Sequence, residues 1–253
     1  MAVDAALLRW ASLGHARIVF RTYGWDRPTL SLGRSEPFPA GWDERALTRE
    51  GIAVVRRPTG GNAVLHWEEV TFAVGATIPG PWRLTPRGFA NATAEALAEA
   101  LQGCGVEAAR VDSTGPRVGA PKPGDAPCFA RSESGEVGAA GYKVAGLASR
   151  FSRTGALCHA SIPLSGRHRE VVSFRAEGMD STASLAIHAR SIGELLGIPP
   201  SLPGSMDRLA GDLANRLAEV VGLRFDVPLV EASFAMLGLE EEPLSSTSRV
   251  GAM

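Results

Sequence analysis

The sequence predicts an α+β domain in which mixed or antiparallel β-sheets are flanked by helices. Strand-like runs and helical patterns are interleaved without the regular alternation of a doubly wound fold. A chain of 253 residues is long enough to bury one large core. Glycine (29 residues) and proline (17) supply many turns, and hydrophobic residues (45%) are not depleted as they are in disordered chains. We therefore expect one domain over residues 1–238 and a frayed tail over residues 239–253.

The first half of the chain contains three predicted helices and five predicted strands. Apolar residues at helical spacing predict a helix over residues 3–13, and a shorter helix is expected over 43–50. The longest helix is predicted over 86–103, because Thr85 is a suitable N-cap and Pro86 fits the first helical position. Runs of β-branched and apolar residues predict strands at 18–23, 29–32, 52–55, 70–78 and 106–111.

The second half begins with a loop rich in proline and glycine. Residues 112–127 contain four prolines and three glycines, which predicts a surface loop. Further strands are expected at 136–140, 143–147, 156–163 and 224–227. Helices are expected at 184–196, 205–221 and 230–237, with Ser205 as the N-cap of the second of these.

Charge and composition exclude several classes of protein. The formal net charge is −1, whereas a nucleic-acid-binding protein usually carries a basic excess. Three cysteines without metal-type spacing argue against a disulfide framework and for a reducing compartment. Asp4 interrupts the first apolar run, so we expect no secretory signal, and no uncharged run approaches the roughly 20 residues of a membrane-spanning helix. These observations predict a soluble cytoplasmic protein that binds neither nucleic acid nor membrane.

Residues 56–61, with the sequence Arg-Arg-Pro-Thr-Gly-Gly, lie between two strand-like runs. Paired glycines let a ligand approach the backbone N–H groups, and the adjacent Arg56 and Arg57 can neutralise a phosphate. The alternative is a hairpin turn with two solvated arginines, which the residues alone favour. His66 follows this stretch, and a lone histidine there is more often structural than catalytic.

Cys128 and Lys143 form a second candidate pair. A thiolate is a good acyl acceptor when nearby positive charge lowers the pKa of the thiol. Lys143 follows closely enough for a loop and a strand to bring it to Cys128, where it can stabilise the oxyanion of a tetrahedral intermediate. On the residues alone, a buried small hydrophobe and a surface charge are the simpler interpretations.

Both stretches resemble motifs of the lipoate–protein ligase and octanoyltransferase superfamily. Residues 56–66 (RRPTGGNAVLH), with Glu69 shortly after them, resemble its arginine–glycine motif. Residues 127–129 (PCF) and 141–146 (GYKVAG) resemble the branch that uses an internal cysteine. Trp25 resembles part of the family's first hairpin, and the resemblance covers about residues 1 to 225.

This resemblance implies a biotin/lipoate ligase type of catalytic domain with Cys128 and Lys143 as catalytic residues. An octanoyl group would pass from acyl carrier protein, through a thioester on Cys128, to a lysine of a lipoyl domain such as that of the glycine cleavage H protein. The implied reaction requires no metal and no diffusible cofactor. The substrate-binding residues that it implies are Arg56, Arg57, Gly60, Gly61, Ala63, His66, Gly146 and His159.

The sequence departs from the family pattern at two places. Residues 147–149 read Leu-Ala-Ser where the family usually has Ser-Ala-Gln, and Ala160 stands where a glycine is usual, so that its Cβ is expected to narrow the pocket. Cys158, beside His159, is a rival nucleophile of lower rank. Cys104 is expected to be structural.

Two alternatives remain open at this point. A lipoate–protein ligase would activate free lipoate with ATP and Mg²⁺ and needs no cysteine; Asn62, in place of a third glycine, and the short tail after Phe225 argue against it. A non-catalytic lipoyl- or acyl-binding homologue would explain the departures as marks of lost activity.

Overall fold

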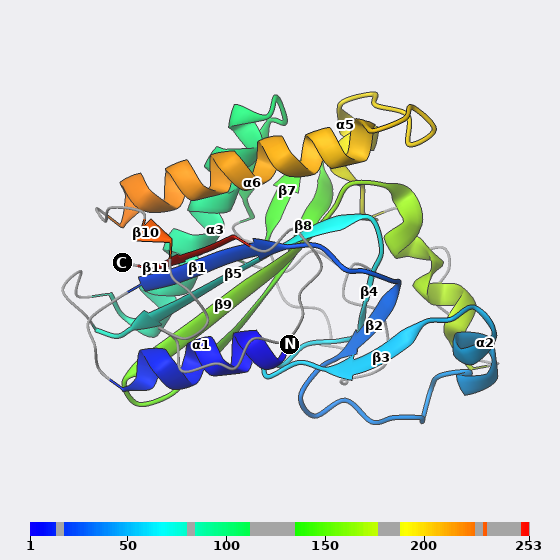
Figure 1. Ribbon diagram of the computed structural model, residues 1–253, viewed down its shortest axis with the longest axis horizontal. Helices are drawn as coiled ribbons and strands as arrows, with labels where there is room; N and C mark the ends of the chain where they lie inside the picture. The colour runs from blue at the N-terminus through cyan, green and yellow to red at the C-terminus, as the bar shows by residue number, and fades with distance from the viewer. Residues whose placement is uncertain are drawn as a thin grey trace.

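The computed structural model describes residues 1–13, 18–79, 84–111, 135–176 and 188–225, together with the backbone of 230–231 and 249–252 (Figure 1). In this part of the chain the main sheet has eight strands, and every neighbouring pair is antiparallel. Their order across the sheet is β10 (Val230–Glu231), β11 (Arg249–Ala252), β1 (Ile18–Tyr23), β5 (Glu69–Thr77), β9 (Gly155–Pro163), β8 (Tyr142–Phe151), β7 (Val137–Ala139) and β6 (Ala108–Arg110).

A smaller sheet of three strands stands beside the main one. Its order is β3 (Ala53–Arg56), β2 (Thr29–Leu32) and β4 (Val64–His66). β2 pairs in parallel with β3 and antiparallel with β4. Two mixed or antiparallel sheets flanked by helices confirm the predicted fold class.

The described helices are α1 (Ala2–Ser12), α2 (Glu44–Arg49), α3 (Pro86–Gly103), the 3₁₀ helix η2 (Gly166–Phe174), α5 (Ile192–Leu195) and α6 (Ser205–Arg224). Of these, α1, α2, α3 and α6 lie close to the predicted positions. η2 was not predicted, and α5 is much shorter than the helix predicted over 184–196. The Thr85 hydroxyl caps α3 by accepting a hydrogen bond from the Gly88 amide at 3.0 Å, as predicted. The cap predicted for α6 is wrong: Gly204 occupies the N-cap, and the Ser205 hydroxyl donates to the Pro199 carbonyl instead. None of the helices described is both long and apolar enough to cross a membrane.

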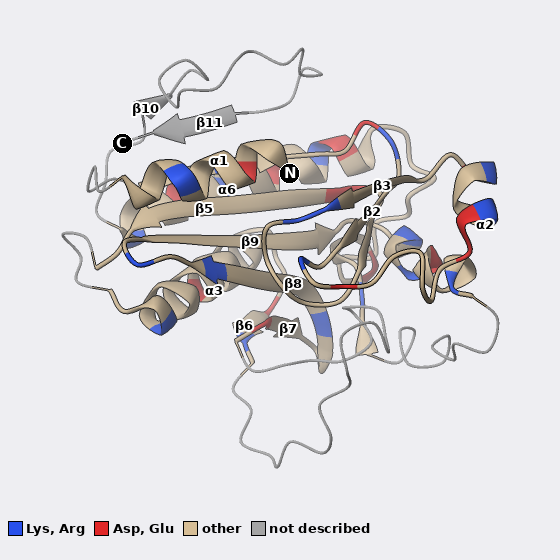
Figure 2. Cartoon of the chain, turned by 90° about the horizontal axis from the view of Figure 1, so that it is seen from below, with Lys and Arg blue, Asp and Glu red and all other residues tan. Residues whose placement is uncertain are grey.

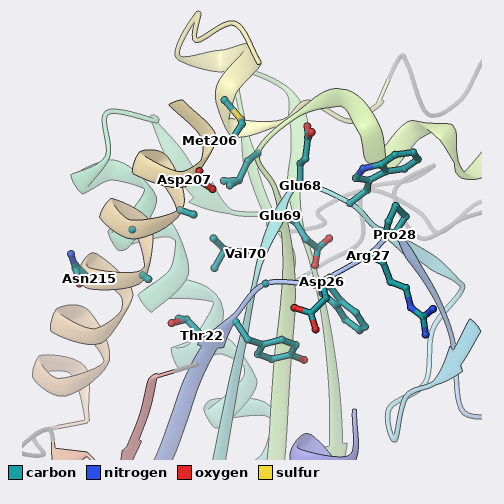
Figure 3. Close-up of a pocket in the computed structure, with 18 residues that line it drawn as sticks. Thr22, Asp26, Arg27, Pro28, Glu68, Glu69, Val70, Met206, Asp207 and Asn215 are labelled. Atoms are coloured by element: carbon teal, nitrogen blue, oxygen red, sulfur yellow. The ribbon is translucent and has the colours of Figure 1, made fainter. Parts of the chain in front are cut away.

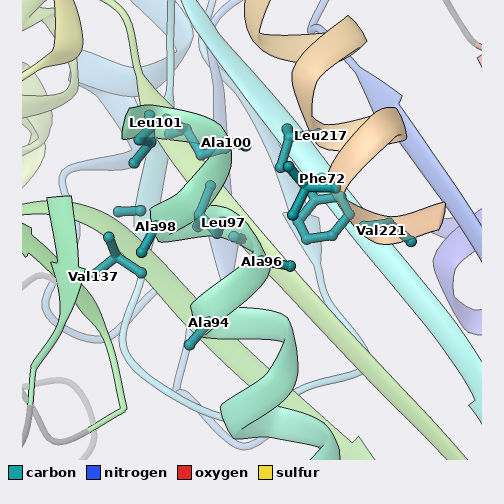
Figure 4. Close-up of a cluster of buried hydrophobic side chains, with 14 of the residues drawn as sticks. Phe72, Ala94, Ala96, Leu97, Ala98, Ala100, Leu101, Val137, Leu217 and Val221 are labelled. Atoms are coloured by element: carbon teal, nitrogen blue, oxygen red, sulfur yellow. The ribbon is translucent and has the colours of Figure 1, made fainter. Parts of the chain in front are cut away.

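The two faces of the main sheet are covered by different helices. α3 and α6 pack against one face and bury the largest apolar cluster, which includes Phe72, Leu97 and Leu217 (Figure 4). α1 lies on the opposite face, where Leu7 packs against Ala73. Because successive side chains of a strand point to opposite faces, Phe72 and Ala73 of β5 belong to different clusters. Figure 2 shows β5 and β9 almost free of charge, with an acidic residue where β5 begins.

Several element boundaries differ from the predicted ones because pairing across the chain overrides local pattern. β4 was not among the predicted strands, and the strand predicted at 224–227 is wrong at its start, since α6 continues to Arg224. The helix predicted at 230–237 begins in strand β10 instead. Within the stretch expected to fray, residues 249–252 form β11 and pair with β1. The loop predicted at 112–127 lies outside the described residues.

Candidate active site

We call residues 57–63, which connect β3 to β4, the glycine loop. β3 and β4 lie on opposite sides of β2, so the loop crosses the end of β2 and does not close a hairpin. The hairpin interpretation of this stretch is therefore wrong. Gly61 has φ +90°, and its carbonyl oxygen would lie 1.9 Å from a Cβ at Gly33. The close approach of these two backbone segments requires glycine at position 33.

Both arginines of the motif donate hydrogen bonds to backbone carbonyls. Arg57 is buried and donates to the carbonyl oxygens of Gly60 at 2.9 Å and Asn62 at 2.7 Å. Arg56 is exposed and donates to the carbonyl oxygen of Gly33 at 2.7 Å. The sequence left two roles open for these guanidinium groups, contact with a phosphate or exposure to solvent. In the structure they fix the backbone of the glycine loop and the strand that faces it.

A small cavity of about 30 Å³ lies between the main sheet and the small sheet, and we call it the inner cavity. Its size is that of about one water molecule. It is lined by Met1, Ser31, Arg57, Val64, His66, Thr71, Gly146, Leu147, Ala148, His159, Ala160 and Ser161. Four of the predicted substrate-binding residues therefore meet here: Arg57, His66, Gly146 and His159. The predicted residues that do not line the cavity are Arg56, Gly60, Gly61, Ala63 and Lys143.

His159 links the N-terminal helix to the glycine loop. Its Nδ1 lies 3.2 Å from the carboxylate of Asp4 in α1, and its Nε2 lies 2.7 Å from the hydroxyl of Thr59. The Asp4 carboxylate, which is fully buried, also accepts hydrogen bonds from Tyr23 at 2.7 Å and Arg21 at 3.1 Å. Burial alone raises the pKa of Asp4, but His159 and the Arg21 guanidinium outweigh it and lower the pKa to about 2. Asp4 is therefore ionised at neutral pH.

His66 is held by a second buried carboxylate. Its Nδ1 lies 2.7 Å from the Glu69 carboxylate and its Nε2 lies 2.6 Å from the Ser31 hydroxyl. Trp25 stacks on the imidazole, with ring centroids 4.1 Å apart. The Ser161 hydroxyl also donates to Glu69, at 2.6 Å. Burial raises the pKa of Glu69, yet His66 and the hydroxyl groups of Ser161 and Thr71, which donate to the carboxylate, lower it overall. His66 is thus both a hydrogen-bonded structural residue and part of the cavity wall.

Asp4 and Ser31 are site residues that the sequence analysis missed. Asp4 stood out in the sequence only because it interrupts an apolar run. An acid on the apolar stripe of a helix must be buried, and buried acids are almost always paired, so this position carried a usable signal. Ser31 is one serine in an alternating strand, and no feature of the sequence distinguishes it.

Lys143 is buried at 1% exposure and forms an ion pair with Glu136, which precedes β7. The interpretation of Lys143 as a surface charge is therefore wrong. A buried lysine is rare and is a candidate for a functional role. Glu136 was not singled out from the sequence, because the pairing depends on the adjacent strands β7 and β8. Cys128 lies outside the described residues.

A larger groove of about 740 Å³ opens between α6 and the β1–β2 and β4–β5 connections (Figure 3). Asp26, Glu68 and Asp207 give it an acidic lining. Trp25 and Glu69 also line it, and both contact residues of the inner cavity, so these two side chains separate the two spaces. None of the predicted site residues that the structure describes lines the groove. The inner cavity is the better candidate site although it is smaller.

The model of the lipoyl protein ligase A/B catalytic domain matches residues 1–214 of this chain. The chain belongs to this family. The match spans α1, the glycine loop, both histidines of the inner cavity and the first half of α6, so the site just described lies inside the lipoyl ligase-type domain.

Relatives with assigned activities are similar over most of their length. An octanoyltransferase LipM of Kyrpidia tusciae is 35% identical over 235 residues, which cover 89% of this chain and 84% of the relative. An octanoyltransferase LipM of an Exiguobacterium species is 30% identical over 91% of this chain and 84% of the relative.

Solved structures share the fold at low identity. A crystal structure of lipoate-protein ligase A bound with ATP has a TM-score of 0.65 at 18% identity, covering 89% of this chain and 79% of that one. A lipoate protein ligase structure from T. acidophilum with bound lipoic acid also has a TM-score of 0.65, at 15% identity, covering 90% of this chain and 82% of that one. These likenesses show the architecture of the lipoyl ligase-type domain.

The departures from the family pattern lie at the boundary between the inner cavity and the core, since Leu147, Ala148 and Ala160 all line the cavity. Ala160 and Leu147 are register partners on β9 and β8, and both pack with the large cluster under α3 and α6. His159, the neighbour of Ala160, points to the opposite face. Ala160 lines the inner cavity while its side chain packs with the core cluster, so the expected narrowing of the pocket by its Cβ stays a prediction.

The described cysteines of this lipoyl ligase-type domain fit structural roles. Cys158 is 1% exposed in the large core cluster, and burial raises the pKa of its thiol to about 11. A thiol with that pKa is almost entirely protonated at neutral pH and is a poor nucleophile. Cys104 caps the end of α3 and its thiol pKa is also raised by burial.

Proposed function

We propose that this protein is an octanoyltransferase that passes an octanoyl group through a thioester on Cys128 to a lysine of a lipoyl domain. Relatives similar over most of the chain carry the name octanoyltransferase LipM. The observation that supports the proposal best is the convergence of Arg57, His66, Gly146 and His159 on one cavity between the two sheets. These residues come from three separate parts of the sequence: the motif at 56–66, strand β8 and strand β9.

The transfer has two steps. The Cys128 thiolate attacks the thioester carbonyl of the donor, the donor thiol leaves, and the octanoyl group becomes a thioester of the enzyme. The acceptor amine then attacks this thioester, loses a proton, forms the amide and releases the Cys128 thiolate. Lys143 donates a hydrogen bond to the carbonyl oxygen and stabilises the negative charge that develops there in both steps.

Acyl carrier protein is the donor in this proposal, and a lipoyl-domain protein such as the glycine cleavage H protein is the acceptor. A thioester is an activated acyl group, and its conversion to an amide is favourable in free energy. The proposed reaction therefore uses no ATP, metal ion or diffusible cofactor. The two lipoate–protein ligase structures described above are 18% and 15% identical to this chain, and at that identity they support the fold and not the activity.

The test is the intact mass of the full chain after incubation with octanoyl-acyl carrier protein. We expect wild type to gain one octanoyl group that survives denaturation and is released by hydroxylamine, as a thioester is. Cys128→Ser should gain no hydroxylamine-labile octanoyl group, whereas Cys158→Ser, the matched control, should be acylated like wild type. Transfer to a lipoyl domain should follow when the acylated enzyme is isolated and mixed with the acceptor.

Two results would contradict the proposal. Modification of a lipoyl domain by free lipoate, dependent on ATP and unaffected by Cys128→Ala, would make the protein a ligase. Absence of any adduct or transfer, with donor or with lipoate and ATP, would make it a binding homologue.

A further inference from the structure

Three distant parts of the chain meet at His159. Asp4 belongs to α1, His159 to β9 on the main sheet, and Thr59 to the glycine loop beside the small sheet. The carboxylate, the imidazole and the hydroxyl form a continuous chain of hydrogen bonds of 3.2 and 2.7 Å. All three residues are buried, at 0%, 6% and 0% exposure. A buried polar group that loses its hydrogen-bond partner costs free energy, so these hydrogen bonds hold α1, β9 and the glycine loop together.

The glycine loop is bound to the main sheet at two neighbouring residues. The Pro58 carbonyl oxygen accepts an exposed hydrogen bond from Arg150 of β8 at 3.1 Å, and Thr59 makes the buried contact. The Thr59 carbonyl oxygen accepts a hydrogen bond from the Arg34 amide at 2.8 Å, which ties it to the backbone after β2. Its hydroxyl is the atom that contacts His159. Gly60 and Gly61 follow directly and have no side chains that could hold the loop. Arg57 holds the loop from the side of the small sheet, and Thr59 supplies its buried side-chain contact with the main sheet.

We propose that Asp4 is a positioning residue for the acyl transfer, which acts through His159 to hold Thr59, and with it the glycine loop, at the inner cavity. This inference rests on the proposed function. An ionised carboxylate has no hydrogen to donate, so Nδ1 of His159 must carry the hydrogen of that bond. In the neutral ring Nε2 is then left bare, and it accepts a hydrogen bond from the Thr59 hydroxyl. Asp4 thus sets the tautomer of His159, and the tautomer sets the direction of the bond that holds the loop.

Asp4→Asn tests the tautomer. Oδ1 of Asp4 accepts from Arg21, so the oxygen of the asparagine must stay there and its NH₂ group must face His159. That NH₂ donates to Nδ1 and moves the ring hydrogen to Nε2. We expect the ¹⁵N chemical shifts of the His159 ring to show Nδ1–H in wild type and Nε2–H in Asp4→Asn, with His159→Gln used to assign the signals. An unchanged tautomer would overturn the proposal.

Thr59→Val and Thr59→Ser test the positioning. The octanoyl-acyl carrier protein concentration that gives half-maximal acylation of Cys128 should rise about three- to tenfold in Thr59→Val, the loss of one buried hydrogen bond. The maximal acylation rate should change less, and Thr59→Ser, which keeps the hydroxyl, should restore the wild-type concentration. Thr77→Val is the matched control: the Thr77 hydroxyl donates to Ala11 of α1 at 2.9 Å, remote from the loop, and its loss should leave this concentration unchanged.

The double variant decides whether Asp4 acts through Thr59. Asp4→Asn should raise the half-maximal donor concentration in wild type but add nothing in the Thr59→Val background, because the link is already broken. Effects that multiply in the double variant would overturn the proposal. If wild type itself takes up no octanoyl group, the proposed function fails, while the tautomer of His159 still decides the hydrogen-bond chain independently of activity.

Discussion

Two buried carboxylates, Asp4 and Glu69, each hold a histidine at the inner cavity. An uncompensated buried charge is expensive, so each acid is surrounded by donors: Arg21, Tyr23 and His159 around Asp4, and His66 with hydroxyl groups around Glu69. Each imidazole at the cavity is thus held in place by a hydrogen bond to a buried carboxylate. Removal of either carboxylate would leave several buried hydrogen-bond donors without their acceptor.

Gly33 gives a prediction at this scale. A Cβ at this position would lie 1.9 Å from the Gly61 carbonyl oxygen, so Gly33→Ala must push the glycine loop away from the strand that faces it. We expect the free energy of unfolding to fall by about 1–3 kcal/mol, the usual cost of overpacking. Gly60→Ala is the control, because a Cβ there meets no atom within 4 Å. Urea denaturation compares the two, and equal losses would contradict the expectation.

The chemistry of individual residues was only partly predictable from the sequence. His159 and His66 were found through their motifs, which keep catalytic residue types at a fixed spacing. The burial of Lys143 was not foreseen, because its partner Glu136 reaches it through the pairing of β7 with β8. The contact of Asp4 with His159 joins residues far apart in sequence, and no local pattern encodes it.

Among the elements, α3 is specified by signals within its own sequence, whereas several strands are not. Thr85, Pro86 and the apolar stripe of α3 specify a helix within one stretch of chain, and the prediction was confirmed. β4 and β11 depend on partners elsewhere: β4 on β2, and β11 on β1. A short strand is stabilised by its neighbours, so its own sequence says little about it.

Thr85 gives a prediction for α3. Its hydroxyl accepts the hydrogen bond of the Gly88 amide, and the side chain is otherwise exposed, so Thr85→Ala removes the cap without opening a cavity. We expect a loss of about 1 kcal/mol in the free energy of unfolding, measured by urea denaturation. Thr85→Ser retains the hydroxyl and should lose far less. A loss of equal size in both variants would show that the cap is not the cause.

At the scale of the whole molecule, the candidate site lies where two sheets and an N-terminal helix meet. The main sheet supplies His159 and Gly146, the small sheet supplies His66, and α1 supplies Asp4. None of these elements forms the site alone. The stability of the assembled domain and the geometry of the site are therefore coupled through the same buried ionic contacts.

This coupling predicts how stability depends on pH. The pKa of Asp4 is lowered from 3.8 to about 2 in the folded chain, so the stability that its ionised form contributes is present above pH 4 and is lost as the pH falls through about 2. Wild type should therefore exceed Asp4→Asn in the free energy of unfolding by more at pH 6 than at pH 2.5, by about 1.5 kcal/mol. Urea denaturation of both proteins at the two pH values measures this difference. A difference that is constant over this range would contradict the lowered pKa.

In the part of β9 from Cys158 to Ile162, one face of the strand lies at the inner cavity and the other lies in the core. Substitutions on the two faces are therefore expected to have different effects. His159 and Ser161 line the inner cavity, while Cys158 and Ile162 pack under α3 and α6. Substitutions at these four positions should sort into two classes. Changes at His159 and Ser161 will shift substrate preference, and changes at Cys158 and Ile162 will lower abundance in cells. Leu157, although on the same face as His159, is buried under α1 with Leu7, so engineering for a new acyl group should begin at His159 and Ser161.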